Sequence, residues 1–154
     1  MIILLEDNPG DILLVQKALQ KHHVRHRLHV IRDGEEALAY VARIGEPGGE
    51  PLPDLVLLDL NMPKADGAEI LSAVRRHPGC ARVPVIIVSS SATLRDQARM
   101  AQLGVARYFR KPFDFDEFMQ LGAVVREVAA REVEDGLTVA DKRRRRESNP
   151  PAAA

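Results

Sequence analysis

The chain has 154 residues, with 22 lysines and arginines against 22 aspartates and glutamates, and 45% of its residues are hydrophobic. This length favours one domain with one core, and the zero net charge argues against wholesale nucleic-acid binding, which needs a basic excess. The single cysteine, Cys80, excludes an internal disulfide and a cysteine-rich zinc site. No apolar run approaches the length of about 20 residues that a membrane-spanning helix needs. We therefore expect a cytoplasmic protein.

Short apolar runs alternate along the chain with longer amphipathic stretches, which indicates an α/β fold. The predicted strands are 2–5, 28–31, 55–58, 85–88 and 106–109, and an amphipathic helix is predicted after each of them. Strands that alternate with helices imply right-handed crossovers and a parallel sheet covered on both faces. The run Leu55–Leu58 is apolar throughout, as is typical of a strand buried on both faces.

The domain is predicted to span residues 1–135. Its last helix runs from Asp114 to about Val133, and the helical pattern fails near Gly136. Charged residues and then a Pro/Ala-rich stretch follow, so we expect 136–154 to be a flexible C-terminal tail. We therefore expect no DNA-binding domain.

Polar side chains stand where the predicted strands end. Glu6 and Asp7 follow the first strand, Asp59 follows the third, Ser89 the fourth and Lys111 the fifth. Ligands of open α/β sheets bind beyond the carboxyl ends of the strands, so we expect these residues to converge. Carboxylates about 4 Å apart repel by about 4 kcal/mol at an effective dielectric constant near 20, and Mg²⁺ would keep them ionised.

This set of groups suits phosphoryl transfer. An aspartate can act as a nucleophile toward phosphorus, and most of the remaining task is to stabilise charge on the phosphoryl oxygens. Lys111 would neutralise one of these oxygens as a point charge, and Ser89 would donate a hydrogen bond to another.

The same residues carry a resemblance to a known family. The chain is similar to the CheY-like receiver domains of two-component response regulators over roughly Ile2 to Ala130, and the motifs fall in the family's order and spacing: Glu6-Asp7, Asp59, Asn61-Met62-Pro63, Asp66-Gly67, Ser89 and Lys111-Pro112. The resemblance implies a doubly wound, flavodoxin-like sheet of five parallel strands in the order 2-1-3-4-5.

The resemblance also implies roles for individual residues. Asp59 would accept a phosphoryl group from a histidine kinase, and Lys111 would hold that group. Mg²⁺ would be bound by Asp7 and Asp59, by the backbone carbonyl of Asn61, and by Glu6 mostly through water. The implied structural residues are Gly67, before a helix, and Pro112, after a cis bond.

A switch is implied as well. Ser89 would move toward the phosphoryl group, and Tyr108, three residues before Lys111, would turn inward in response. The surface that changes would comprise the fourth helix, the fifth strand and the fifth helix. A complete shift from 1:99 to 99:1 requires about 5.5 kcal/mol of differential interaction.

Two features resemble a narrower group of receivers. These are the opening Glu6–Asp11 and the Pro/Gly-rich loop before Pro53-Asp54. Both resemble the corresponding segments of stand-alone receivers that are paired with bacterial and cyanobacterial phytochromes. Such receivers often form homodimers. We therefore expect a bacteriophytochrome as the kinase and a homodimer as the assembly. The alternatives are a phosphorelay intermediate and a receiver from a two-component system without a phytochrome.

Two other function classes remain open. One is a small phosphatase with an aspartyl nucleophile, although such haloacid-dehalogenase-like enzymes place Asp-x-Asp after the first strand, and here position 61 is Asn. The other is a passive receiver-like dimer scaffold. We expect a signalling switch that catalyses only its own phosphorylation and dephosphorylation, and no turnover enzyme.

Overall fold

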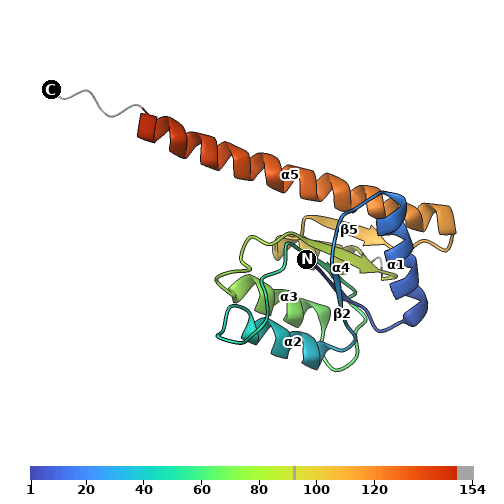
Figure 1. Cartoon of the computed structure of the whole chain (residues 1–154). Coiled ribbons are helices and arrows are strands. Elements are labelled where there is room, and N and C mark those ends of the chain that lie inside the picture. The colour runs from blue at the N-terminus through green and yellow to red at the C-terminus, as the bar shows by residue number, and fades with distance from the viewer. Residues whose placement is uncertain (92, 149–154) are drawn as a thin grey trace.

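The computed structural model describes residues 1–91 and 93–148, with side chains described as far as Glu134. Strands and helices alternate along this part of the chain (Figure 1). The strands are β1 (Ile2–Leu5), β2 (Leu28–Ile31), β3 (Leu55–Leu58), β4 (Val85–Ser89) and β5 (Arg107–Arg110). The helices are α1 (Pro9–Lys21), α2 (Gly34–Arg43), α3 (Gly67–Arg76), α4 (Leu94–Gln102) and α5 (Phe115–Ser148).

The strands form one parallel sheet in the order β2-β1-β3-β4-β5, as predicted. Leu5 at the end of β1 lies beside Leu58 at the end of β3, and Leu58 lies beside Ile87 of β4. Because the strands are parallel and in this register, their carboxyl ends lie along one edge of the sheet.

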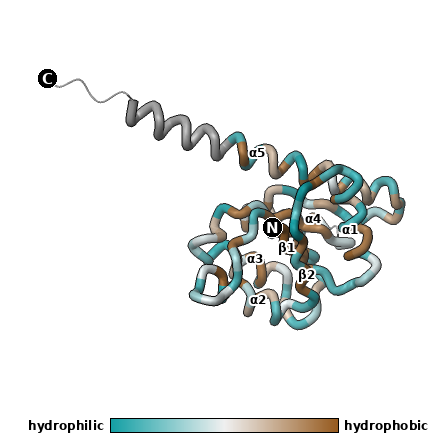
Figure 2. The backbone as a smooth tube through the Cα atoms, in the orientation of Figure 1, coloured by the Kyte–Doolittle hydropathy of each residue, from teal (hydrophilic) through white to brown (hydrophobic). Residues whose placement is uncertain are grey.

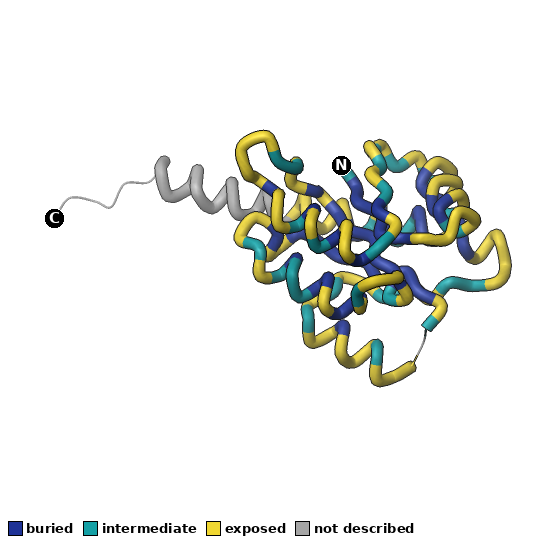
Figure 3. Tube along the Cα trace, turned by 90° about the horizontal axis from the view of Figure 1, so that it is seen from below, coloured by how far each residue is buried: buried dark blue, intermediate teal, exposed yellow. Residues whose placement is uncertain are grey.

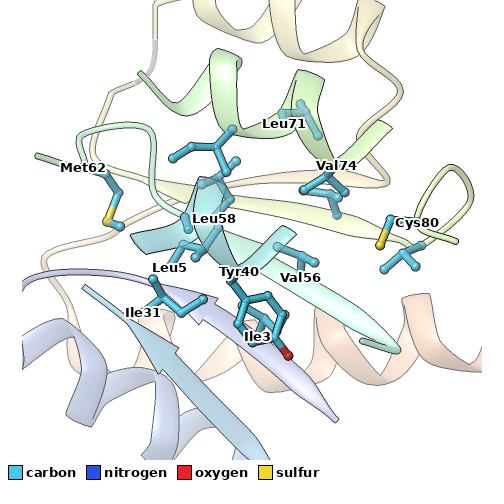
Figure 4. Close-up of a cluster of buried hydrophobic side chains, with 14 of the residues drawn as sticks. Ile3, Leu5, Ile31, Tyr40, Val56, Leu58, Met62, Leu71, Val74 and Cys80 are labelled. Atoms are coloured by element: carbon cyan, nitrogen blue, oxygen red, sulfur yellow. The ribbon is translucent and has the colours of Figure 1, made fainter. Parts of the chain in front are cut away.

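Two hydrophobic layers cover the sheet because successive side chains of a strand point to opposite faces. Ile2 and Leu4 of β1 pack in the layer that contains α1 and α5, whereas Ile3 and Leu5 pack in the layer that contains α2, α3 and α4. Figure 4 shows the second layer, where Tyr40 reaches β1 from α2. The central strands are hydrophobic in Figure 2 and buried in Figure 3, while the outer sides of the helices are exposed.

Gly67 begins α3 at a point of close contact with the loop that follows β3. A Cβ atom there would lie 2.8 Å from the Cα of Leu60, which is the residue after Asp59. The side chain of Asp66 caps the helix by accepting a hydrogen bond from the Ala68 N–H. The glycine therefore lets α3 start directly against the segment that carries Asp59.

The last helix is longer than predicted. The sequence pattern placed its end near Val133 and a flexible tail from Gly136, but the backbone of α5 remains helical to Ser148 (Figure 1). Strong helix formers (Ala, Lys, Arg and Glu) make up much of this stretch, and no proline interrupts it before Pro150. The remainder of the predicted tail, 149–154, lies outside the described residues. Within the described ranges, no helix has an apolar stretch sufficient to cross a bilayer.

The packing of α1 against α5 yields a stability prediction at Gly122. A Cβ atom on Gly122 would lie 2.1 Å from the carbonyl oxygen of Ala18 and 2.6 Å from Cδ2 of His22. Gly122→Ala is expected to destabilise the fold by roughly 1–3 kcal/mol through overpacking, although Gly→Ala in an exposed helix stabilises by about 1 kcal/mol. Urea unfolding measures the change, with Ala129→Gly as the control for helix propensity alone. A more stable Gly122→Ala variant would contradict the close contact.

Candidate functional site

The carboxyl edge of the sheet brings together side chains from three strand ends. Glu6 and Asp7 follow β1, Asp59 follows β3, and Lys111 follows β5. Glu6 and Asp59 are almost fully buried, and the Lys111 side chain is only 10% exposed. These predicted residues are far apart in the sequence, and the parallel register places them in one cluster.

Lys111 is the centre of this cluster. Its Nζ donates hydrogen bonds to Asp59 Oδ2 at 2.6 Å, to Glu6 Oε2 at 2.7 Å and to Asp11 Oδ2 at 2.8 Å. An ammonium group has three hydrogens, so each of them has a carboxylate partner. These charge-assisted bonds hold the nitrogen against the buried carboxylate of Asp59.

The acids form a set suited to a hard cation. One carboxylate oxygen from each of Glu6, Asp7 and Asp59 lies within 4.8 Å of the other two, and Asp7 is exposed to solvent. Mg²⁺ prefers oxygen ligands, is bound by one or two carboxylates and keeps several waters. The donor set and its open side at Asp7 fit such an ion.

The electrostatics of the cluster shift two pKa values in the same direction. Burial, together with the nearby charge of Asp59, raises the pKa of Glu6 to about 7. The hydrogen bonds that Glu6 accepts from Lys111 and from the Asn8 N–H act in the opposite direction but are outweighed. Burial alone would lower the pKa of Lys111, but the hydrogen bonds to Asp11, Asp59 and Glu6 outweigh it and raise the pKa. The ammonium therefore stays charged, whereas Glu6 titrates near neutral pH when no metal is bound.

Asn61 connects Asp59 to Ser89. The backbone N–H of Asn61 donates to Asp59 Oδ1 at 2.9 Å, and its side-chain Nδ2 donates to Ser89 Oγ at 3.5 Å. Ser89 itself is fully buried at the end of β4. The assignment of the Asn61 carbonyl to a metal stays a prediction, because the contacts of this residue involve its nitrogen atoms.

Tyr108 reaches the same loop from β5. Its hydroxyl donates to the carbonyl oxygen of Ser91 at 2.7 Å, and the Ser91 N–H donates to Ser89 Oγ at 3.3 Å. Burial, followed by the charge of Asp96, raises the pKa of Tyr108. The two predicted switch residues are thus joined through one residue of the loop between β4 and α4.

The expected cis bond before Pro112 is not found: the described residues contain no cis peptide bond. The trans form of a bond before proline is favoured by about 0.5–1 kcal/mol in unconstrained chains. Lys111 reaches all three carboxylates with this bond in the trans form, so the geometry of the cluster does not require the cis isomer.

Asp11 belongs to the cluster and was not among the predicted site residues. It lies in the first turn of α1, where its own N–H donates to the capping side chain of Asn8. The available signal was topological: in a parallel α/β sheet the helix after a strand begins at the strand's carboxyl edge. An acid in the first turn of α1 therefore starts close to the residues that follow β1.

Comparisons with known proteins find relatives in sequence and in fold. The model of the response regulator receiver domain matches residues 2–122. Response regulator Rcp1 of Synechocystis is 35% identical over 121 residues, which are 79% of this chain and 82% of Rcp1. An Mn²⁺-bound crystal form of Rcp1 superposes with a TM-score of 0.70 at 35% identity, covering 79% of this chain and 87% of that one.

Two further solved structures are similar. The phosphorylated cyanobacterial phytochrome response regulator RcpA has a TM-score of 0.73 and 39% identity, covering 82% of this chain and 90% of its own. The bacteriophytochrome response regulator RtBRR has a TM-score of 0.64 and 36% identity, covering 76% of this chain and 72% of its own.

The raised pKa of Glu6 predicts how stability depends on pH without metal. Unfolded Glu6 releases its proton near pH 4.5, whereas folded Glu6 holds it to about pH 7. The folded state binds more protons in this window, so the free energy of unfolding falls as the pH rises from about 5 to 7, by roughly 2–3 kcal/mol. Urea unfolding in EDTA measures this loss, and Mg²⁺ is expected to restore more stability at pH 8 than at pH 5.

Glu6→Gln should flatten this pH profile, because the glutamine does not titrate. Glu69→Gln, which changes an exposed acid in α3, is the matched control and should follow the wild type. Equal slopes for Glu6→Gln and the wild type would rule out Glu6 as the titrating group.

Proposed function

The chain belongs to the response regulator receiver domain family, and from this membership we propose that Asp59 accepts a phosphoryl group from a histidine kinase in the presence of Mg²⁺. The observation that carries the proposal is the contact of 2.6 Å between Lys111 Nζ and the Asp59 carboxylate. The carboxylates of Glu6 and Asp7 lie within 4.8 Å of that of Asp59. Phosphorylation then switches a surface that binds other proteins.

The transfer step uses groups that are already in position. One carboxylate oxygen of Asp59 attacks phosphorus, while the bond from phosphorus to the donor imidazole nitrogen breaks and this nitrogen keeps the electron pair. Lys111 donates a hydrogen bond to a phosphoryl oxygen as negative charge develops there. Glu6, Asp7 and Asp59 would hold Mg²⁺, which neutralises charge on the phosphoryl oxygens when bound.

Dephosphorylation reverses the covalent change. A water oxygen attacks phosphorus, and the bond to the Asp59 oxygen breaks with its electron pair, which releases inorganic phosphate and restores the carboxylate. The protein therefore catalyses only its own modification. This distinguishes a signalling switch from a phosphatase that turns over external substrates.

The switch follows from the hydrogen bonds at the end of β4. A hydroxyl that accepts hydrogen bonds can still donate its own hydrogen, and we propose that Ser89 donates to the phosphoryl group. Movement of Ser89 disturbs the bond from the Ser91 N–H, and with it the Ser91 carbonyl that holds the Tyr108 hydroxyl. Tyr108 then turns inward, and the surface of α4, β5 and α5 changes.

The expected partners are a bacteriophytochrome kinase and a second copy of the chain. The first rests on the similarity to RcpA and RtBRR, whose names identify them as phytochrome response regulators. The second is supported by exposed aromatic side chains in the loop before α5 and at its start, where Phe113 is fully exposed and Phe115 is 50% exposed.

The buried free thiol of Cys80 suits a reducing cytoplasm.

Phosphorylation of Asp59 can be measured with radiolabelled acetyl phosphate and Mg²⁺. The wild type is expected to become labelled and to lose the label in hydroxylamine, which attacks acyl phosphates, whereas Asp59→Asn should label at least about a hundredfold less because the nucleophile is missing. Asp54→Asn, an exposed acid before β3, is the control and should label normally. Undiminished labelling of Asp59→Asn would refute the assignment.

The same variants should be profiled against phosphorylated histidine kinases of the source genome. A bacteriophytochrome is expected to transfer its phosphoryl group fastest. Faster transfer from another kinase would exclude the phytochrome pairing while leaving the phosphoacceptor assignment intact. Multiple turnovers on p-nitrophenyl phosphate would favour the phosphatase alternative.

Light scattering of the full chain tests the homodimer, which should have twice the mass of one chain. Phe113→Ser is expected to raise the dissociation constant about tenfold, since loss of one aromatic contact costs about 1–2 kcal/mol. Leu52→Ser removes another exposed apolar side chain, 51% exposed, and should leave the mass unchanged. A monomeric wild type would contradict the dimer.

A further inference from the structure

We propose that Asp11 is a positioning residue that holds the Lys111 ammonium in place for the phosphoryl group. Asp11 Oδ2 lies 2.8 Å from Lys111 Nζ, and 28% of the Asp11 side chain is exposed. This inference rests on the proposed phosphorylation of Asp59 and assigns a role to a fourth acid that takes no part in the covalent step.

The three carboxylates around Lys111 have different roles in the proposed reaction. Asp59 is the group that reacts, and Glu6 also belongs to the acid set that fits Mg²⁺. Asp11 lies outside that set, and its carboxylate accepts a hydrogen bond from the Lys111 ammonium. It is therefore the one of the three partners that can be changed without removing a nucleophile or a proposed metal ligand.

Phosphorylation changes what Asp59 can offer to Lys111. The carboxylate of Asp59 carries a full charge before the reaction, but its carbonyl oxygen in the acyl phosphate does not. The ammonium hydrogen that pointed at Asp59 becomes available to a phosphoryl oxygen. The bonds to Glu6 and Asp11 persist through this exchange, so the nitrogen keeps its position while one acceptor replaces another.

A second fixed partner is needed because lysine is a flexible residue. Its charge lies at the end of a flexible four-carbon stem, and a single hydrogen bond to Glu6 leaves the nitrogen free to pivot about that contact. Asp11 approaches from α1, whereas Glu6 follows β1. Two bonds from different elements fix the direction of the third hydrogen.

A purely structural role for Asp11 makes a different prediction. An acid in the first turn of a helix stabilises it through the helix dipole, and loss of that effect changes stability without changing the chemistry at Asp59. Asp116 occupies the first turn of α5 and is exposed. Asp116→Asn therefore loses the same charge in an equivalent place without altering the contacts of Lys111.

The test measures the maximal rate of phosphorylation of the full chain by acetyl phosphate at saturating Mg²⁺. Asp11→Asn is expected to lower this rate about tenfold, since misplacement of a catalytic group by about 1 Å can cost a hundredfold. Its Mg²⁺ affinity should stay within about threefold of the wild type, because the lost charge acts on the metal only at longer range. Asp11→Glu keeps the carboxylate and should restore at least half of the lost rate.

Four outcomes are informative. A rate loss in Asp11→Asn that Asp11→Glu rescues and Asp116→Asn does not share supports the positioning role. An unchanged rate, or an equal loss in Asp116→Asn, overturns it while the labelling of Asp59 in the wild type still supports the proposed function. A failure of Asp11→Glu to rescue also overturns it. Absence of labelling in the wild type overturns both proposals.

Discussion

The arrangement of this molecule depends on one buried ammonium group among carboxylates. Lys111 Nζ contacts Glu6, Asp11 and Asp59, and Asp7 stands beside two of these acids. When all four acids are ionised, one lysine cannot balance them, and the resulting repulsion is strong where solvent is excluded. The cluster is therefore suited to gaining positive charge from a metal ion and to holding an anionic group against that ion. The proposed phosphoryl chemistry uses this imbalance directly.

The fold supplies the precision that this cluster requires. The register that sets Leu5 beside Leu58 brings the residues after β1 and β3 side by side, and the backbone bond from the Lys111 N–H to the Ser89 carbonyl ties the segment after β5 to the end of β4. The glycine that starts α3 lets this helix meet the loop carrying Asp59 without a steric clash. β1, β3 and β4 are buried along their whole length, and placement of functional groups at the ends of packed strands favours preorganisation.

The proposed connection from the phosphorylation site to the signalling surface runs through polar contacts. The Asn61 side chain bonds Ser89, and the Ser91 backbone bonds both Ser89 and Tyr108. We propose that a change in the charge on Asp59 reaches β5 through Asn61 after β3, Ser89 at the end of β4 and Ser91 before α4. These contacts link the residues in one continuous network, and the protein belongs to the response regulator receiver domain family.

The sequence alone determined the fold class, the strand order implied by the resemblance, and most of the cluster. Apolar runs such as Leu55–Leu58 mark buried strands because burial on both faces requires apolar residues throughout, and acids placed directly after such runs must gather at one edge of a parallel sheet. Only the structure showed the rest. The partnership of Asp11 with Lys111, the trans bond before Pro112 and the continuation of α5 to Ser148 were not predicted. The contact of Asp11 with Lys111 depends on two segments that are distant in the sequence. The isomer before Pro112 depends on a small energy difference. The length of α5 depends on helix propensity that persists where amphipathic periodicity has ended.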